Sequence, residues 1–302
     1  MSRTLAYTVP PEWDGRPVKE FVRRFLGLSS RVLVKQKHLT GGLLKNSVPC
    51  RSVDLLRQGD VLQLCLPEER EQYEAVEGPL SVLYEDADYL LVDKPPHMPI
   101  HPSPGHDRDS LLNRVAFYYR QTGQSPAFRP LYRLDRDTSG IVAVGKHRIA
   151  VSAAQVEKIY YAVCQGELFG EGKIDLPIGL EPGSKIRRRC GEGGLPAVTH
   201  WRALACQEDC TLVACRLETG RTHQIRVHMA ALGHPLAGDD LYGGSRGRIP
   251  RQALHCGSLS LGCGPLGTAL KVDSPFPADM TGAFPWIAGF SSNILVQRLR
   301  RS

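Results

Sequence analysis

The chain has 302 residues and a formal net charge of +7 at pH 7. This length can bury a substantial core, in one large domain with a smaller one or in two similar domains. The positive charge favours a polyanionic partner, either nucleic acid or an anionic membrane surface. No window approaches the roughly 20 consecutive apolar residues of a spanning helix, and residues 1–13 lack the apolar core of a signal peptide. We therefore expect a cytoplasmic protein without a membrane partner.

Residues 15–66 predict two short basic helices followed by a strand. Residues 18–26 carry apolar side chains at helical spacing, and the serines before residues 31–38 can cap a second helix. A turn then leads into a strand over residues 61–66. Exposed cations of this unit would contact phosphate, which gives affinity without sequence information, unless they form only a basic solvated face. They are Arg23, Arg24, Arg31, Lys35 and Lys37.

Residues 67–79 are acidic and polar, and such a composition cannot offset its ordering entropy. We predict a small domain over residues 1–66, a linker over 67–79 and a larger domain over 80–302 that ends in a basic extension. The larger domain begins with two strands, at residues 82–84 and 89–92, followed by a fixed, proline-rich loop. Two cations of that loop could approach a phosphate or stay solvated. They are Lys94 and His101.

Residues 131–140 place two carboxylates among arginines, just before the apolar run at residues 141–144 that predicts a short buried strand. A nearby positive charge favours the ionised form of Asp135, which suits a nucleophile or a base better than an acid. Asp137 can bond to the backbone two residues on and is interpreted as structural. The alternative for the whole segment is an ion-pair loop without catalytic use.

The later elements are helices and strands in alternation. Helices are predicted at residues 111–119 and 147–157, and strands at 158–164, 198–205 and 211–217. Strand periodicity sends Tyr160 and Tyr161 to opposite faces, so only one of them can share a site with Asp135. The basic, glycine-rich residues 185–194 predict a mobile loop that could wrap nucleic acid, or a solvated charge run.

Residues 220–228 predict the start of a helix rich in cations. Thr222 can cap it, and its apolar stripe of Ile225, Met229 and Leu232 ends at Gly233. Three potentially cationic side chains crowd the first turn, where the helix dipole disfavours each by about 0.3–1 kcal/mol. Such an arrangement makes sense where an anion binds.

Three of these segments resemble signatures of the RluA-type pseudouridine synthases. Residues 132–140 resemble His-Arg-Leu-Asp-x-Asp-Thr-Ser-Gly, residues 158–162 resemble Lys-x-Tyr-x-Ala, and residues 220–228 resemble Gly-Arg-x-His-Gln-Ile-Arg-x-His. The proline-rich loop resembles a fourth family element. Three residues depart from the family pattern, because Tyr132 stands in place of the leading His, Asp93 stands in the place of Asn, and His97 stands where Gly is usual.

The resemblance implies an α+β fold with a mixed, largely antiparallel central sheet flanked by helices and loops. It also implies catalytic roles for Asp135, for Tyr160 as the residue that stacks on the target base and assists proton removal, and for Arg226 as the partner of the acid. It further implies that Arg133 positions the RNA and that Ile225 lies beside the base. Arg221 and His223 are weaker candidates, for contact with the RNA backbone or for support.

The amino-terminal segment resembles the small α/β RNA-binding domain of the ribosomal protein S-four type. The match includes Ser30-Arg31 and Gly59-Asp60, while the usual asparagine-glycine hairpin is blurred. Such a domain would present Arg31 and Lys35 to phosphate. It favours ribosomal RNA as the partner, with transfer RNA left open, and we expect a monomer without an obligate protein partner.

The implied reaction isomerises a uridine within RNA and needs no cofactor, since it involves neither a redox change nor a group donor. The chain lacks Gly-x-Gly-x-x-Gly and Walker-type loops, and its nine scattered cysteines show no zinc-site spacing. Asp135 would attack the anomeric carbon or remove a sugar proton. Two alternatives remain: a catalytically silent RNA-binding or ribosome-assembly factor of the same fold, and a glycosidase-like hydrolase with two working carboxylates.

Overall fold

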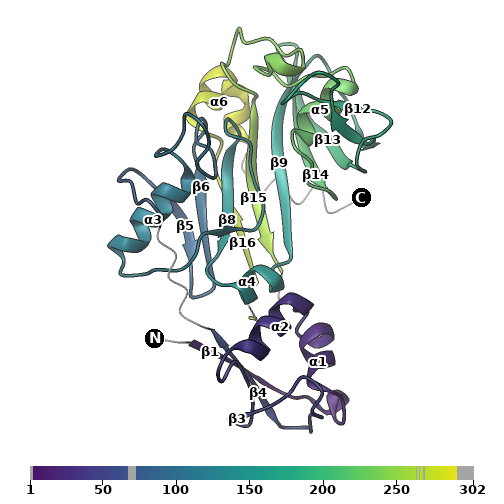
Figure 1. The fold of residues 1–302 in the computed structure, drawn as a ribbon. Helices are drawn as coiled ribbons and strands as arrows, with labels where there is room; N and C mark the ends of the chain where they lie inside the picture. Colours follow the sequence, from purple (N-terminus) through teal and green to yellow (C-terminus); the bar gives the residue numbers. More distant parts are fainter. Residues whose placement is uncertain (1–2, 67–72, 263, 265, 268, 291–302) are drawn as a thin grey trace.

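The computed structural model describes residues 3–66, 73–262, 264, 266–267 and 269–290. Within them, an amino-terminal unit with a four-stranded sheet lies below a larger unit built on a ten-stranded sheet (Figure 1). The basic carboxy-terminal extension expected from the sequence falls outside the described residues. No helix of the described ranges has the length and apolar character needed to cross a membrane.

The amino-terminal sheet has the strand order β1-β4-β2-β3. Its strands are β1 (Arg3–Thr8), β2 (Leu43–Lys45), β3 (Val48–Pro49) and β4 (Val61–Leu66). The predicted strand is β4, whose alternate leucines face the core, and β1 is an additional strand that pairs with it. Asn46 and Ser47 both adopt left-handed φ, at 50° and 66°, so the β2–β3 hairpin forms without an asparagine-glycine pair.

The helices of this unit share one core with its sheet. They are η1 (Pro11–Trp13), α1 (Val18–Glu20), the π-turn η2 (Phe21–Phe25) and α2 (Ser30–His38). The second predicted helix is α2, and the Ser29 side chain caps it by accepting a 3.4 Å bond from the Val32 amide. The first is only partly helical. Its end widens into η2, which rotates Phe25 out of the core to 45% exposure.

The larger sheet has the order β10-β13-β14-β9-β15-β8-β6-β5, with β16 beside β15 and β7 beside β8. Its pairs are antiparallel except β15 with β8, so the expected mixed, largely antiparallel sheet is confirmed. The strands are β5 (Ser81–Glu85), β6 (Tyr89–Lys94), β7 (Arg129–Pro130), β8 (Ser139–Gly145), β9 (Val156–Gln165), β10 (Glu171–Asp175), β13 (Val198–Gln207), β14 (Cys210–Leu217), β15 (Leu254–Leu261) and β16 (Leu270–Asp273).

The remaining elements flank this sheet. They are α3 (Leu111–Gln121), α4 (Arg148–Ala153), α5 (Gln224–Ala231), α6 (Ala278–Ala283), the 3₁₀ turns η3 (Asp240–Tyr242) and η4 (Pro285–Gly289), and the two-stranded sheet of β11 (Ile178–Leu180) and β12 (Arg188–Cys190). As predicted, Tyr160 and Tyr161 enter different cores: Tyr160 packs in the cluster that contains α3 and α5 residues, and Tyr161 packs with α6 and η4.

Three local expectations are corrected. The helix predicted over residues 147–157 is the short α4, because the chain turns extended at Ala154 and pairs as β9 with β15 from Val156 onward. The predicted mobile loop is instead partly ordered, since β12 pairs with β11. Thr222 does not cap α5; the residue before the helix is His223, at a left-handed φ of 58°, and Leu232 of the predicted apolar stripe is 39% exposed.

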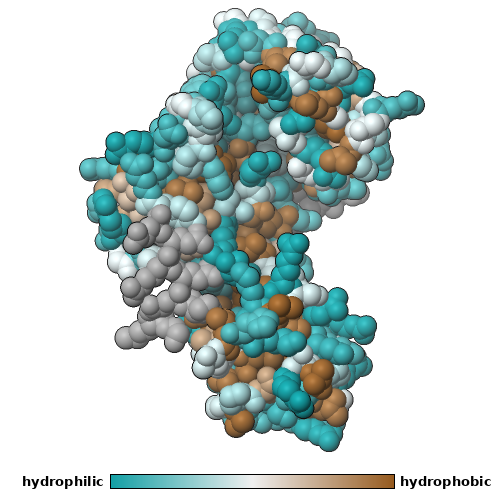
Figure 2. All heavy atoms as spheres, in the orientation of Figure 1, coloured by the Kyte–Doolittle hydropathy of each residue, from teal (hydrophilic) through white to brown (hydrophobic). Residues whose placement is uncertain are grey.

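The two units contact one another through α4 and the turn before β6. Ile149 and Ala153 of α4 join the amino-terminal core, and Arg3 forms an ion pair with Asp88. Figure 1 shows α2 and α4 facing each other at this junction, and Figure 2 shows apolar surface beside it on a face that is mostly hydrophilic. Of the predicted linker, residues 67–72 lie outside the described part, and residue 74 binds α3 through a 2.8 Å bond from Asn113 to its carbonyl.

β8 brings the signature segment to one end of the large sheet. All seven of its residues are buried between β6 and β15, so the preceding loop is held against a rigid strand. Gly140 adopts φ +112°, and a Cβ there would lie 2.3 Å from the Cys256 carbonyl oxygen. Only glycine permits this close approach of two backbones.

We predict that Gly140→Ala lowers the free energy of unfolding by about 3 kcal/mol or more, because both the left-handed φ and the clash must be relieved. Gly170→Ala is the matched control. Gly170 also has a positive φ, +77°, but a Cβ added there would have no atom within 4 Å, so a loss of about 1 kcal/mol is expected. Urea unfolding measures both variants. Equal losses would contradict the close-approach argument.

Candidate active site

Asp135 lies in the loop before β8, and its carbonyl accepts a 3.1 Å bond from the Thr138 amide that closes the turn. Its side chain is 29% exposed, so it is reachable from solvent yet partly enclosed. Arg226 of α5, 91 residues further along the chain, places its Nη1 atom 3.6 Å from the Asp135 Oδ2 atom. The two signature motifs therefore meet at one point in space.

Arg226 is held from behind by Asp239. The Nε and Nη2 atoms of Arg226 each donate a 2.7 Å hydrogen bond to the Asp239 carboxylate, whose side chain is fully buried. This bidentate geometry leaves Nη1 to face Asp135. Burial lowers the pKa of Arg226, but the Asp239 bonds and the Asp135 charge outweigh it, so the pKa is raised and the guanidinium stays charged.

Tyr242 of η3 closes the other side of Arg226. Its ring centre lies 5.1 Å from the guanidinium carbon, a cation–π contact. Its hydroxyl accepts a 2.9 Å bond from the Arg188 amide and lies 2.8 Å from the His223 Nδ1 atom. Burial lowers the pKa of His223 even though the Asp135 charge opposes this, so the imidazole is neutral near pH 7.

Tyr160 reaches the same region from β9 and is 6% exposed. Burial raises the pKa of its phenol well above 10, and the charge of Asp135 raises it further. The phenol therefore stays protonated at neutral pH. It can stack and hydrogen-bond, but it is poorly suited to remove a proton as a base.

Lys94 has a different role from the expected one. It is fully buried, and its ammonium donates 2.9 Å bonds to the carbonyls of Pro95, Met98 and Arg136. Burial lowers its pKa to about 7, while the charge of Asp137 opposes this shift. The predicted phosphate contact of Lys94 is thus corrected, because the ammonium ties the proline-rich loop to the segment that carries Asp135.

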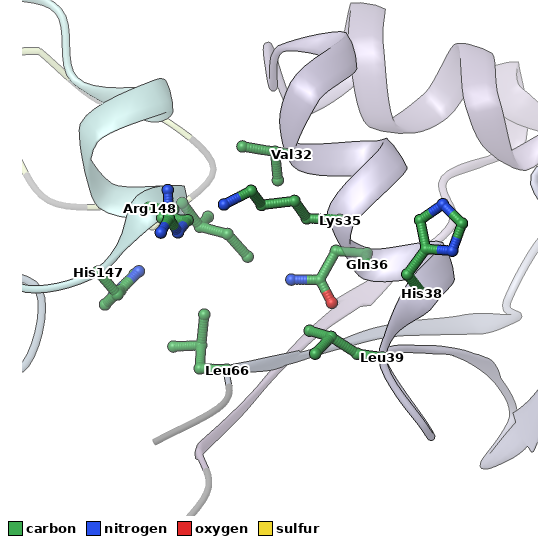
Figure 3. A pocket seen from close by; sticks show the side chains of 9 residues that line it. Val32, Lys35, Gln36, His38, Leu39, Leu66, His147 and Arg148 are labelled. Atoms are coloured by element: carbon green, nitrogen blue, oxygen red, sulfur yellow. The ribbon is translucent and has the colours of Figure 1, made fainter. Parts of the chain in front are cut away.

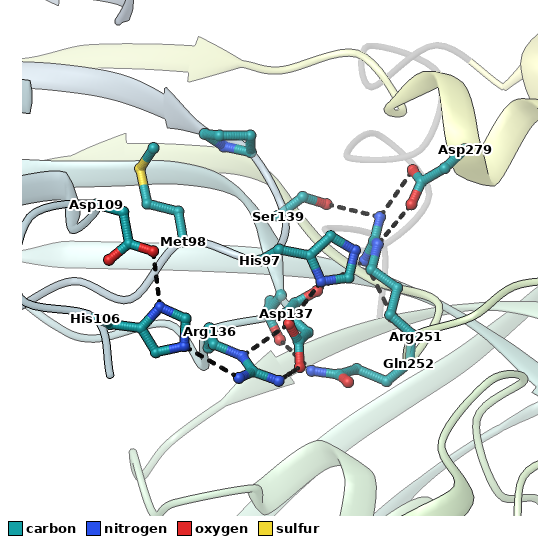
Figure 4. A network of polar contacts seen from close by, with 12 residues as sticks. His97, Met98, His106, Asp109, Arg136, Asp137, Ser139, Arg251, Gln252 and Asp279 are labelled. Atoms are coloured by element: carbon teal, nitrogen blue, oxygen red, sulfur yellow. Dashed lines mark hydrogen bonds and ion pairs between the residues drawn. The ribbon is translucent and has the colours of Figure 1, made fainter. Parts of the chain in front are cut away.

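Asp137 fixes the same segment from its exposed side. Its carboxylate lies 2.9 Å from the His97 Nδ1 atom and accepts two 3.1 Å bonds from Arg136 (Figure 4). Although burial raises the pKa of Asp137, these bonds lower it overall. Arg136 therefore pairs with Asp137, and the cation beside Asp135 is Arg226.

Arg251 anchors the segment from within. Its buried guanidinium donates a 3.0 Å bond to the Asp137 carbonyl and a 2.6 Å bond to the Asp279 carboxylate (Figure 4). Its Nη2 atom also donates a 3.3 Å bond to the Ser139 hydroxyl. Buried cations with several acceptors hold a loop in one geometry at a desolvation cost. The loop that displays Asp135 is thus fixed by Lys94, Asp137 and Arg251.

The other predicted residues divide between this region and the amino-terminal unit. Arg133 is exposed on the Asp135 loop, and Ile225 is buried in the same core cluster as Tyr160. Arg221 is exposed and donates a 3.0 Å bond to the Pro196 carbonyl. Arg31 and Lys35 are exposed on α2 and are not brought to Asp135.

The chain resembles known pseudouridine synthases over most of its length. The family model for RNA pseudouridylate synthase matches residues 88–231. The RNA pseudouridine synthase YjbO of Bacillus subtilis is 42% identical over 87% of this chain and 96% of its own length. Ribosomal large subunit pseudouridine synthase D of Pseudomonas aeruginosa is 33% identical over 93% of this chain and 94% of its own length. The chain belongs to the RluA family of RNA pseudouridine synthases.

Solved structures agree with this assignment. The human RNA pseudouridylate synthase domain containing 1 protein superposes with a TM-score of 0.59 at 26% identity, over 78% of this chain and 98% of its own. The human domain containing 4 protein, at 19% identity and a TM-score of 0.51, supports the fold. The chain is thus an enzyme, an RNA pseudouridine synthase with the expected α+β fold.

Sequence reasoning missed three residues of this synthase that support Asp135. Asp239 and Tyr242 lie outside the signature segments, and Arg251 carries no motif. The available signal was weak: a buried Arg226 requires an acidic partner, but Asp239 and Asp240 are adjacent and equally suitable in sequence. The structure distinguishes them, because Asp240 pairs with Arg246 at the surface.

We predict that Asp239→Asn lowers the free energy of unfolding by about 3 kcal/mol, because it leaves the buried Arg226 without its anionic partner. Asp240→Asn is the matched control, and a change of less than about 1 kcal/mol is expected, since both groups of its ion pair are more than half exposed. Urea unfolding measures both. A loss of less than about 1 kcal/mol for Asp239→Asn, as expected for an exposed pair, would refute its role as the anchor of Arg226.

The pH dependence of stability should report on His255, which is 1% exposed and lies 3.0 Å from the Ser139 hydroxyl. Burial, aided by the charge of Arg251, lowers its pKa to about 4 despite the Ser274 carbonyl, against an ordinary 6.5. The unfolded chain therefore binds a proton below pH 6.5 that the folded chain refuses until about pH 4. The free energy of unfolding therefore decreases as the pH is lowered through that window, by about 2 kcal/mol between pH 7 and pH 5.

Comparison with His255→Gln isolates this effect, because the variant has no imidazole to protonate. Urea unfolding at pH 7 and pH 5 should show a loss in the natural chain that exceeds the loss in the variant by about 2 kcal/mol. Identical losses in both proteins would show that other groups cause the pH dependence.

Proposed function

We propose that Asp135 is the catalytic residue of this pseudouridine synthase and that its substrate is ribosomal RNA. The observation that carries the first part is the 3.6 Å contact between Asp135 and an Arg226 already neutralised by Asp239. Support for the second part comes from relatives named for the large ribosomal subunit, among them the synthase D proteins of Nitrosomonas europaea and Pseudomonas aeruginosa. Such a substrate would place the enzyme in the cytoplasm.

In the proposed reaction, the glycosidic bond of one uridine breaks, the base rotates, and the anomeric carbon rejoins through a ring carbon. The product is an isomer, so atoms and electrons balance without a co-reactant. Asp135 acts on the sugar, either by attack on the anomeric carbon or by removal of a sugar proton. Arg226 orients the carboxylate, and the protonated Tyr160 stacks on the base.

The uridine must leave its stack to reach Asp135, which costs a few kcal/mol. We propose that Ile225 forms the apolar wall beside the extruded base, and that Arg133 positions the RNA backbone. Arg221 and His223 follow as weaker candidates at the start of α5. His223 is neutral there, so it would serve through hydrogen bonds rather than charge.

We further propose that residues 1–66 form an RNA-binding domain like that of ribosomal protein S-four, joined by residues 67–79 to a catalytic domain over 80–302. The exposed side chains of Arg31 and Lys35 on α2 support this, because they are available to phosphate. Together the two domains would supply affinity from one unit and chemistry from the other.

The deciding experiment is Asp135→Asn, which keeps the shape of the side chain and removes its charge. We expect pseudouridine formation to fall by more than about a thousandfold, while RNA affinity changes by less than about threefold, because the exposed cations remain. Asp240→Asn is the control, an exposed acid whose loss should leave the rate unchanged.

Both proteins are tested by mapping pseudouridine in total RNA from a strain that lacks the gene and is complemented with each variant. Normal modification by Asp135→Asn would show that the acid is wrongly assigned. Restoration of sites in transfer RNA alone would refute the ribosomal substrate. Absence of new sites with the natural chain would favour a silent RNA-binding factor.

A further inference from the structure

A cavity of about 310 Å³ lies between α2 of the amino-terminal unit and α4 of the larger unit (Figure 3). Its apolar walls come from both units and consist of Val32, Leu39, Leu66 and Ile149. The size is at the lower end of ligand pockets, which span about 300–1,000 Å³. It suits one small, flat group better than a helix or a strand.

The cavity is separate from the catalytic region. Asp135 precedes β8 and α4 follows it, so the seven residues of β8 stand between them. At about 3.3 Å per residue, this strand spans roughly 20 Å. A ligand in the cavity therefore does not touch Asp135, although an extended polynucleotide could reach both places.

Gln36 supplies the polar group of the cavity. Its side chain is 5% exposed, and its Oε1 atom is buried without a hydrogen-bond partner among the described residues. Figure 3 shows its carboxamide on the α2 wall, facing the enclosed space. A buried acceptor without a partner is costly to the fold, so its presence is explained where a ligand supplies the donor.

The rim of the cavity is cationic. Lys35 extends from α2 toward Arg148 of α4, and His38 lines the cavity on the same helix (Figure 3). Lys35 forms no ion pair within the part of the chain that the structure describes. A cation at the mouth of a cavity favours an anion beside it, and phosphate accepts charged hydrogen bonds well.

We propose that this cavity binds one unpaired nucleotide of the RNA, at a second site remote from the target uridine. The base lies between the apolar walls and donates an N–H to the Gln36 oxygen, and the adjoining phosphate lies beside Lys35. An apolar slot with one amide and a basic rim fits a nucleotide, since bases are read through stacking and edge hydrogen bonds.

The identity of the ligand as RNA rests on the proposed function, whereas the binding of a nucleotide rests on the cavity. Because its walls belong to both units, a bound nucleotide would hold the amino-terminal unit against the larger one. It would also set the distance, along the RNA, between the anchored nucleotide and the uridine presented to Asp135.

The test uses the full chain and a fluorescent, single-stranded RNA of ten nucleotides with mixed sequence, titrated at fixed salt by anisotropy. Gln36→Met retains side-chain volume and removes the amide. We expect it to weaken binding at least fivefold and, at the same time, to raise the Tm, because the unpartnered buried acceptor is gone. A residue that only supports the fold would lower the Tm.

A charge-matched pair completes the test. Lys35→Met should weaken binding at least fivefold, whereas Lys19→Met, on α1 of the same unit but outside the cavity lining, should weaken it less than twofold. Equal losses for the two lysines, unchanged affinity of Gln36→Met, or a lowered Tm of Gln36→Met would each overturn the proposal.

The same proteins are assayed for pseudouridine formation, which separates the two proposals. If the natural chain makes pseudouridine but the cavity variants bind RNA normally, the second nucleotide site is wrong and the proposed function stands. If the variants lose binding as expected but the natural chain makes no pseudouridine in any RNA, the nucleotide site stands and the proposed function is wrong.

Discussion

The contact on which the site depends is a chain of three charges, Asp239 to Arg226 to Asp135. Asp239 takes two of the three guanidinium nitrogens in a buried, bidentate pair, so the third is directed at Asp135 from 3.6 Å. One cation shared between two carboxylates leaves a net negative charge. Asp135 is therefore oriented without being fully neutralised, which is the condition that a nucleophile or base at a sugar requires.

This arrangement needs a loop that does not move, and two further buried basic side chains hold it in place. Lys94 binds three backbone carbonyls around the loop, and Arg251 binds the Asp137 carbonyl while pairing with Asp279. A buried cation is expensive to the fold unless each of its donors is used. That cost is explained if the position of Asp135 must be reproducible to a fraction of an ångström.

Local chemistry made much of this predictable. Serine caps and strand alternation depend on neighbouring residues, so α2, β8 and the opposite faces of Tyr160 and Tyr161 followed from the sequence. Long-range choices did not follow. Whether Asp239 or Asp240 pairs with Arg226, and whether Lys94 points to solvent or to three carbonyls, is decided by tertiary packing that no local pattern records.

Two of the departures from the family signature, Tyr132 and His97, show how the same geometry is kept with other side chains. Tyr132 donates a 2.9 Å bond to the Ile141 carbonyl, and the Lys158 ammonium lies 4.1 Å from its ring centre, so the phenol braces β8. His97 adopts φ 62°, a conformation that glycine accepts more easily. Its imidazole bonds to Asp137, and this contact offsets the backbone strain while adding a support that glycine would lack. Both side chains thus contact the segment that presents Asp135 or the strand behind it.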